Sequence, residues 1–548
     1  MNEATKPSQR ALVALLNILT LFVAWLSWTG GNFFYSPSFF AWAGARPFLH
    51  RILLAGSLAF FFTLLYAAHQ RLSSKALAKV WVFCLWDGLN RWKNIGVVLG
   101  LAAFSVWSLG SVSVARYESF CSGFDLAIFD QAVWNTLHGK FLWSSIKGHA
   151  CLLGDHMSPI LLFYVPGMAI WEDARALLWM QACVLGLNGF LIYWLCAQQW
   201  KQSPLNWAFP LAYFLYLPVR NVAQFEFHPE ILADTFIFLL FLSLAAGKRV
   251  RFIACLIGLV LCKETFWALA FFLGGFLFLF GKEAGKSSFP ARQWGAMLAI
   301  ISPLAFWMEI HFVIPWMSGK PYPYTGNYAG GNLTTLLGNA FSLSSLGYLI
   351  KIFAPLGFVS LLCPKITFLT GFGLLQNLFS RNPATHSIFF QYTIGLTPFV
   401  FIAAIHGARR FAEPRAQARW AIWLLVWSFL FAGVSDHYRC MVYQAQRTPR
   451  LEKIENYLAK IPSQTVVRTN EFFATHLSHR PYLYVPDDGN FWPFEKAAER
   501  GQEKIAVLGK GFGSGVSEVN FRFLRGHGYE MVLEEDGLYV MKAHPGTR

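Results

Sequence analysis

The strongest constraint on the fold is a series of apolar runs of roughly 17–25 residues along the chain. A helix rises 1.5 Å per residue, so a run of that length matches the ~30 Å hydrocarbon core of a bilayer. The composition agrees, with 55% hydrophobic and 17% aromatic residues and a mean hydropathy of +0.42. We therefore expect an all-α polytopic membrane protein.

The runs predict about thirteen transmembrane helices. They lie near 11–29, 48–68, 95–114, 174–198, 204–219, 231–247, 251–262, 265–280, 293–315, 346–363, 366–380, 388–406 and 420–436. The run 251–280 is too long for one span, and Lys263-Glu264 divides it into two short helices. Residues 158–171 are too short to cross and carry two prolines, so they predict an interfacial or re-entrant helix.

Lysine and arginine in the short loops set the orientation, because cytoplasmic loops carry an excess of both. With the N-terminus inside, the inner loops hold nineteen of these residues and the longer outer loops hold eight. The net charge of +16 is thus mostly a topology signal and does not indicate nucleic acid. We expect a multi-pass protein of the inner or plasma membrane with a cytoplasmic N-terminus.

Three regions follow from this organisation. Residues 1–94 contribute two N-terminal helices, 95–436 form the membrane core with a large first outer loop at 115–173, and 437–548 have the composition of a soluble domain. In that last region LEKIENYLAKI is helical in period, TVVRT, PYLYV and KIAVLG read as strands, and EMVLEEDGLYVMKA reads as a hairpin. A small extracytoplasmic α/β domain is expected.

The glycine-rich stretch GKGFGSG (509–515) follows a predicted strand, as a phosphate-binding loop would. It lacks the Lys-Ser/Thr ending of a Walker motif, which favours a turn over a nucleotide site.

Acids and histidines gather in the outer loop 115–156, although only 14% of all residues are charged. Such groups are costly beside hydrocarbon and mark functional sites. The predicted topology sends FEFHPE (225–230), Lys263-Glu264, the loop 316–345 and SRNPATHS (380–387) to the same face. These segments predict one outward-facing cavity, with His386 and Tyr392 as further wall residues.

Asp125 follows Gly123-Phe124 at the start of a segment whose apolar face would lie in the membrane interface. This placement lifts Asp125 over the cavity, where it could act as a base, with Asp130 and Gln131 as supporting residues. The alternative is that Asp125 caps the helix.

Two further groups could bind a divalent cation or a phosphate. Asp155-His156 precedes the segment 158–171, and Glu226, His228 and Glu230 alternate before a predicted helix start at Pro229. The alternatives are helix capping by Asp155 and a solvated loop around Glu230. A metal at Asp155, His156 and Glu226 is an expectation from these residue types.

Lys263-Glu264 is the costliest pair in the chain, because both charges lie between apolar runs. One reading is an ion pair between the two neighbours, and the other is that Lys263 faces a lipid phosphate. Cys121 and Cys151 share the outer loop, where they are either a disulfide or two free thiols. No GxSxG, HExxH or Walker motif is present.

Several motifs in order resemble those of an uncharacterised bacterial and archaeal family of polytopic membrane proteins. They are GFDLAIFDQAVWNTLHGK, LLGDHMSPILLFYVP, FEFHPEILAD, CKET and IPSQTVVRTNEFFATHLSHR. That family in turn resembles the GT-C superfamily of glycosyltransferases, which use polyprenyl-phosphate sugars and carry an acidic residue in the first large outer loop. The resemblance covers about 115–545 and implies a catalytic role for Asp125 and a donor-phosphate role for Lys263. We add His228 as a second residue expected to bind the donor phosphate. Residues 1–94 depart from the family plan, in which this loop follows the first span.

The sequence therefore supports a membrane glycosyltransferase-like protein whose partners are a polyprenyl-phosphate-linked sugar and membrane lipid. The alternatives are a non-enzymatic lipid or solute transporter and a cell-envelope assembly protein. A transporter would distribute its charges along a path through the bilayer, whereas these charges gather at one face.

Overall fold

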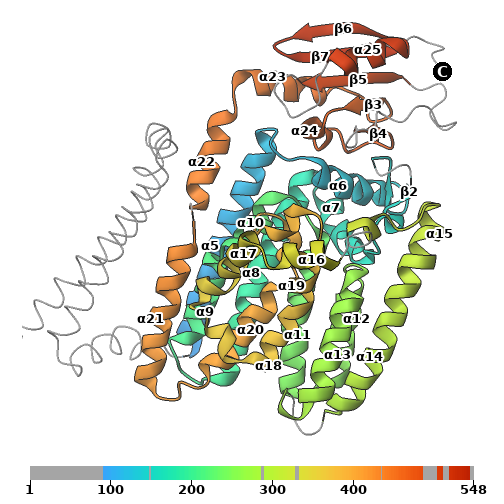
Figure 1. Cartoon of the computed structure of the whole chain (residues 1–548). Coiled ribbons are helices and arrows are strands. Elements are labelled where there is room, and N and C mark those ends of the chain that lie inside the picture. The colour runs from blue at the N-terminus through green and yellow to red at the C-terminus, as the bar shows by residue number, and fades with distance from the viewer. Residues whose placement is uncertain are drawn as a thin grey trace, which may run out of the picture.

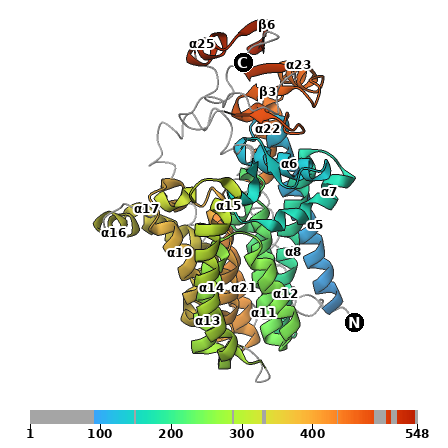
Figure 2. The ribbon, with the colours of Figure 1, turned by 90° about the vertical axis from the view of Figure 1, so that its right-hand side faces the viewer.

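Figure 1 shows the computed structural model of the chain, in which residues 91–146, 150–284, 289–327, 333–433, 435–485, 503–509 and 518–543 are described. A long helical body carries a smaller α/β unit at one end (Figures 1 and 2). The predicted spans 11–29 and 48–68 and residues 510–515 of the glycine-rich segment lie outside the described residues.

The body is built from helices joined by short 3₁₀ turns. Its helices are α5 (Arg91–Glu118), α6 (Phe124–Leu137), α7 (Val165–Ile170), α8 (Ala174–Gln199), α9 (Leu205–Leu215), α10 (Leu217–Phe225), α11 (Leu232–Ala246), α12 (Arg249–Val260), α13 (Thr265–Ala284), α14 (Ala291–Met308), α15 (Ile314–Ser318), α16 (Leu333–Ala340), α17 (Leu343–Phe353), α18 (Pro364–Thr367), α19 (Gly371–Leu378), α20 (Thr397–Ala408) and α21 (Pro414–Phe431).

Five helical segments in the described part of the chain are long and apolar enough to cross a membrane. They are Asn94–Glu118, Ala174–Gln199, Pro229–Ala246, Ala291–Ser318 and Ala416–Gln446. Five shorter apolar segments accompany them: Pro159–Ile170, Leu205–Leu215, Thr265–Gly281, Leu343–Leu356 and Thr397–Ala408. The prediction of about thirteen full spans is therefore supported only in part.

Proline and glycine explain why several predicted spans are shorter than their apolar runs. The run 204–219 is divided after Leu215, and Pro218 lies in the first turn of the next helix. The run 388–406 becomes helical only at Thr397, because Gly395 before it adopts φ +78°. Hydropathy alone does not report these interruptions.

Two features that the sequence predicts in the membrane region are present in the structure, a chain break and a short helical segment. The chain breaks at Lys263-Glu264, between α12 and α13. The segment 158–171 forms a 3₁₀ helix η2 (Pro159–Tyr164) followed by α7, and it exposes Phe163, Ile170 and Trp171. An apolar surface on so short a helical segment fits an interfacial position.

Close helix approach holds α13 against α14. A Cβ on Gly295 would lie 2.4 Å from the backbone nitrogen of Phe278, and one on Gly274 would lie 2.9 Å from that of Ala299. Only glycine allows this spacing, which membrane helices use in place of a hydrophobic driving force.

The C-terminal unit contains a five-stranded mixed sheet in the order β4-β3-β5-β7-β6. Its elements are α22 (Asp436–Gln446), α23 (Pro449–Leu458), β3 (Val466–Thr469), α24 (Glu471–Ala474), β4 (Leu483–Tyr484), β5 (Lys504–Gly509), α25 (Glu518–Gly526), β6 (Tyr529–Glu535) and β7 (Leu538–Ala543). β3 is parallel to β4 and β5, whereas β7 is antiparallel to β5 and β6. The predicted hairpin is present, with Asp536 and Gly537 both at positive φ.

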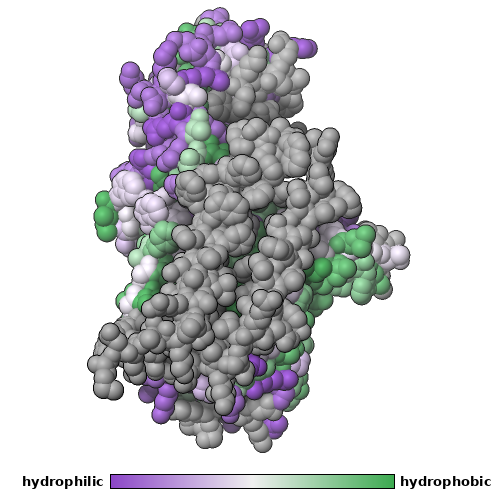
Figure 3. Space-filling view, turned by 90° about the vertical axis from the view of Figure 1, so that its left-hand side faces the viewer, coloured by the Kyte–Doolittle hydropathy of each residue, from purple (hydrophilic) through white to green (hydrophobic). Residues whose placement is uncertain are grey.

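Surface chemistry agrees with a body that crosses a membrane. Figure 3 shows hydrophilic residues over the C-terminal unit and again at the opposite end, with hydrophobic residues between them. The two cysteines of the outer loop, Cys121 and Cys151, are free thiols in this structure.

Candidate functional site

The site begins at the N-terminus of α6, which displays Asp125. Gly123 is the N-cap and has no side chain to satisfy the first backbone N–H groups. A carboxylate from a distant segment does so instead: Glu226 accepts hydrogen bonds from the nitrogens of Gly123 at 2.7 Å and Leu126 at 3.0 Å. Asp125 is therefore not the cap that the alternative reading assigned.

Glu226 is itself fixed by a buried ion pair. Its Oε1 lies 3.2 Å from a guanidinium nitrogen of Arg116, at the end of α5. Burial raises the pKa of Glu226, while Arg116 and the two backbone N–H groups oppose that rise. The negative charge also suits the positive end of the α6 dipole.

Asp125 faces His228 across a distance of 3.4 Å, from Oδ2 to Nε2. The His228 side chain is buried, whereas the Asp125 side chain is 34% exposed, so the pair has one closed and one open side. The backbone N–H of His228 donates to Gln181 at 2.9 Å, which fixes the histidine to α8. Burial lowers the pKa of His228, but Asp125 and Glu230 outweigh it and raise the pKa overall.

Lys263 is linked to this pair through Glu230, two residues after His228. Its Nζ contacts Oε1 of Glu230 at 3.2 Å, and its side chain stays 20% exposed. Glu230 sits in the 3₁₀ turn η3 (Pro229–Ile231), which begins at Pro229 as the sequence predicts. The ion pair is therefore between Lys263 and Glu230, and Glu264 has other partners.

Glu264 joins three segments of the outer face. Its fully buried carboxylate accepts hydrogen bonds from Tyr322 at 2.8 Å and from the Met157 nitrogen at 3.0 Å, and it lies 2.8 Å from Nδ1 of His156. The His156 ring stacks on Tyr324 at 4.3 Å, and Tyr324 donates to Asp155 at 3.0 Å.

Two tyrosines connect these groups into one site. Burial raises the pKa of Tyr324, and the carboxylates of Asp155, Glu264 and Asp125 add to the effect. Burial also raises the pKa of Tyr392. The carboxylates of Asp125 and Glu230 raise it further, whereas the ammonium of Lys263 opposes the rise. The contacts link the site in series: Asp125 meets His228, Glu230 meets Lys263, and the next residue, Glu264, meets His156. Asp155 joins the series through Tyr324, which stacks on His156.

The residues predicted to bind a metal are not brought together as a ligand set. Glu226 serves the α6 N-terminus and Arg116, whereas Asp155 and His156 lie with Tyr324 and Glu264. Within the described ranges, no group of three or more histidine, cysteine, aspartate or glutamate side chains could hold a metal ion. The geometry does not fit the predicted metal centre.

Asp130 and Gln131 point away from the site and bind the C-terminal unit. The Ser478 hydroxyl donates to Asp130, and His479 Nε2 lies 3.1 Å from the same carboxylate. Gln131 donates to the Arg480 carbonyl at 2.9 Å. Both residues support the site indirectly, because they attach α6 to the segment 471–483.

Residues 116–540 match the family described as "Predicted membrane protein (DUF2079)". The chain belongs to this family. No curated protein matches it.

Among solved structures, this DUF2079 protein is similar to ArnT from Cupriavidus metallidurans bound to undecaprenyl phosphate. The TM-score is 0.50 at 10% identity, and the match covers 82% of this chain and 98% of that chain. The apo form of ArnT gives a TM-score of 0.48 at 10% identity, with 81% and 100% covered. The resemblance to the GT-C fold expected from the motifs is confirmed.

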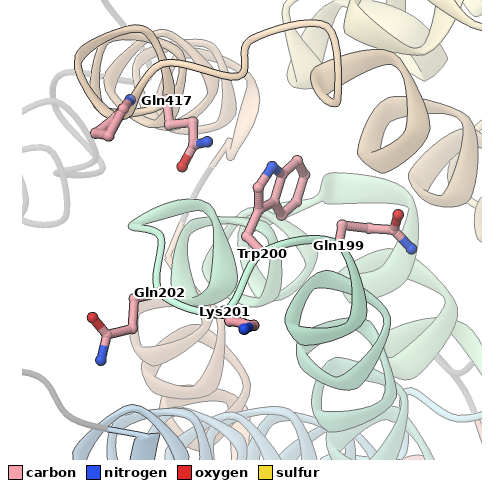
Figure 4. Close-up of a pocket in the computed structure, with 6 residues that line it drawn as sticks. Gln199, Trp200, Lys201, Gln202 and Gln417 are labelled. Carbon is pink, nitrogen blue, oxygen red and sulfur yellow. The ribbon is translucent and has the colours of Figure 1, made fainter.

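Several residues of the site in this DUF2079 protein escaped sequence reasoning. Arg116 looked like an ordinary loop charge, and Tyr322 and Tyr324 were visible only as part of a Gly/Tyr-rich loop. A surface pocket of about 520 Å³ lies elsewhere, and it is lined by Gln199, Trp200, Lys201, Gln202, Pro414 and Gln417 (Figure 4). It lies between the end of α8 and the start of α21 and contains none of the candidate residues, so we place the site by its side-chain chemistry.

Proposed function

We propose that this protein is a GT-C-type membrane glycosyltransferase, which transfers a sugar from a polyprenyl-phosphate donor to an acceptor hydroxyl on the extracytoplasmic side. The observation that carries the proposal is the half-open pair of Asp125 and buried His228, with Lys263 bound to Glu230, two residues after His228. The fold it shares with ArnT supports the class of donor, since that protein was crystallised with undecaprenyl phosphate.

The roles follow from charge and exposure. Asp125 accepts the proton of the acceptor hydroxyl as that oxygen attacks the anomeric carbon, a general-base contribution of roughly 10²–10⁴-fold. The bond between that carbon and the phosphate oxygen breaks, and the polyprenyl phosphate leaves with the bonding electrons. Lys263 stabilises the negative charge of the departing phosphate.

His228 holds the base in place. Because its backbone is tied to Gln181 and its ring is buried, it presents Nε2 to Asp125 from a fixed position. The contact from Nε2 to Oδ2 fixes how the partly exposed Asp125 carboxylate faces the acceptor, which restricts the direction of proton transfer.

The test of the base uses Asp125→Asn in lipid nanodiscs, with undecaprenyl-phosphate-linked radiolabelled sugars and an envelope fraction as the source of acceptor. We expect loss of label transfer by at least about 10²-fold, with an unchanged melting temperature. Asp130→Asn is the matched control, because Asp130 lies on the same helix and faces the C-terminal unit. Transfer that survives Asp125→Asn would refute the assignment.

The test of the phosphate site uses Lys263→Met, which deletes the ammonium and keeps an unbranched apolar chain. Donor binding should weaken by roughly 1.5–3 kcal/mol, the range for a hydrogen bond to a charged group. Since Glu230 would then lose its partner, Lys263→Met/Glu230→Gln separates the charge effect from a folding effect. Equal donor affinity in the double variant and the parent would rule out a phosphate role.

A further inference from the structure

Glu309 is a carboxyl group that the proposed mechanism does not use. It lies within the apolar segment Ala291–Ser318. Only 17% of the most apolar part of this segment is buried inside the protein. An ionisable side chain at such a position is costly and needs a partner or a function. The helix also changes its winding there, because Glu309–Val313 (η4) is a π-helical insertion between α14 and α15. Such insertions are rare and concentrate at functional sites.

Only one of the two carboxyl oxygens of Glu309 has a hydrogen-bond partner in the described part of the chain. Oε1 accepts a hydrogen bond from Trp267 Nε1 on α13 at 2.9 Å. Oε2 is buried, and no group in the described part of the chain bonds to it. A buried polar atom without a partner requires an explanation, and a bound ligand is one.

Trp267 places this pair next to the proposed phosphate site. It lies in the first turn of α13, and its backbone N–H donates to the Glu264 carbonyl at 3.2 Å. Lys263, the proposed phosphate ligand, directly precedes Glu264 in the chain. Trp307 and Phe312 near Glu309 are about half exposed, as expected for side chains in contact with lipid. The pair is therefore joined through the start of α13 to the segment that carries Lys263, and its neighbours on the other side are exposed apolar side chains.

We propose that Glu309 and Trp267 bind the sugar of the lipid-linked donor as it enters sideways from the membrane. The free Oε2 would accept a hydrogen bond from a sugar hydroxyl, and the indole would cover an apolar face of the ring. This inference rests on the proposed function, because it assigns to the same site the part that recognises the sugar as distinct from the phosphate.

The experiment compares two probes in nanodiscs: undecaprenyl phosphate alone and undecaprenyl phosphate linked to each of a panel of hexoses and pentoses. Glu309→Leu and Trp267→Phe should weaken binding of the preferred sugar-linked probe by about 10-fold or more and leave the affinity for undecaprenyl phosphate unchanged. Trp307→Phe, a lipid-facing tryptophan of the same segment, is the matched control and should change neither affinity.

Each result is decisive. The inference is wrong if the two variants change the affinities for both probes equally, or change neither affinity. A lower melting temperature in that case would mean that Glu309 only joins α13 to the helix that follows it. Trp267→Phe keeps an aromatic ring, so it answers the question even if Glu309→Leu does not fold. If the parent protein binds neither probe, the proposed function itself fails.

Discussion

His476 provides a test of how the C-terminal unit is held on the site. Its ring is sandwiched between Tyr117 at 4.3 Å and Phe120 at 3.9 Å, and both stacks are nearly parallel. Nε2 donates to the Tyr117 carbonyl at 3.1 Å, which fixes the neutral tautomer. Burial lowers the pKa of His476 to about 3; Arg175 and Arg447 act in the same direction, whereas the Tyr117 carbonyl and Asp173 oppose it.

The sign of the pH effect follows from that shift. An unfolded histidine titrates near 6.5, so acid protonates the released ring well before the packed one. The stability that His476 contributes is fully present above pH ~6.5 and falls with acidification by up to ~1.4 kcal/mol per unit. Between pH 6.5 and 5 the loss is on the order of 2 kcal/mol.

His479, three residues later, should show the opposite slope. Burial lowers its pKa, but the Asp130 carboxylate outweighs burial and raises the pKa overall. The contribution of His479 is therefore fully present below pH ~6.5 and is lost as the pH rises through its folded-state pKa. Two histidines of one segment thus serve as controls for each other.

The measurement is the opening free energy of segment 471–483 by hydrogen exchange at pH 5, 6.5 and 8, after correction for intrinsic exchange rates. His476→Phe keeps the stacked ring and removes the titration, so the advantage of the parent over this variant should shrink by about 2 kcal/mol from pH 6.5 to pH 5. For His479→Gln the advantage should shrink toward pH 8. A difference between parent and His476→Phe that is constant with pH would refute the reasoning.

Two further predictions concern the frame of the site. Glu226→Gln should destabilise the protein by up to about 3 kcal/mol, because it leaves the partly buried Arg116 without its counter-charge. Glu118→Gln, at a more exposed pair with Arg175, should cost about 0–1 kcal/mol, and thermal unfolding in detergent would rank the two variants. For the orientation, a membrane-impermeant maleimide on intact cells should label Lys140→Cys and reach Lys248→Cys only after lysis. The reverse pattern would place the site in the cytoplasm.

Features with a local cause were predictable from the sequence. The break at Lys263-Glu264 follows from two charges in an apolar run, and the β6–β7 hairpin follows from Asp536-Gly537 between alternating residues. The interfacial segment after His156 follows from its length and its prolines. Each depends on neighbours within a few positions, so one sequence is enough to predict it.

Pairing between distant segments was not predictable in this way. Glu264 could have paired with Lys263, yet its partners are His156, Met157 and Tyr322. Asp130 resembled a site residue, yet it binds Ser478, 348 positions away. Sequence spacing specifies which residues share a helix face but not which remote segment that face meets. The three residues predicted to hold a metal show the same limit, since Glu226 lies with α6 and Arg116 and does not lie with Asp155 and His156.

The segment FEFHPE (225–230) combines a local pattern that the sequence shows with long-range contacts that only the structure shows. Glu226 and His228 both have extended backbones, so alternate side chains project to the same side. On that side Glu226 meets the N-terminus of α6 and His228 meets the carboxylate of Asp125. Glu230, in the 3₁₀ turn that follows, meets the ammonium of Lys263. The alternation was visible in the sequence, but its consequence was not. One short segment, extended at Glu226 and His228 and turned at Glu230, sets the position of the helix that carries the proposed base, contacts the base, and positions the cation for the leaving phosphate. A displacement at any of its three acidic or imidazole groups should therefore disturb base and cation together, which separate loops would not do.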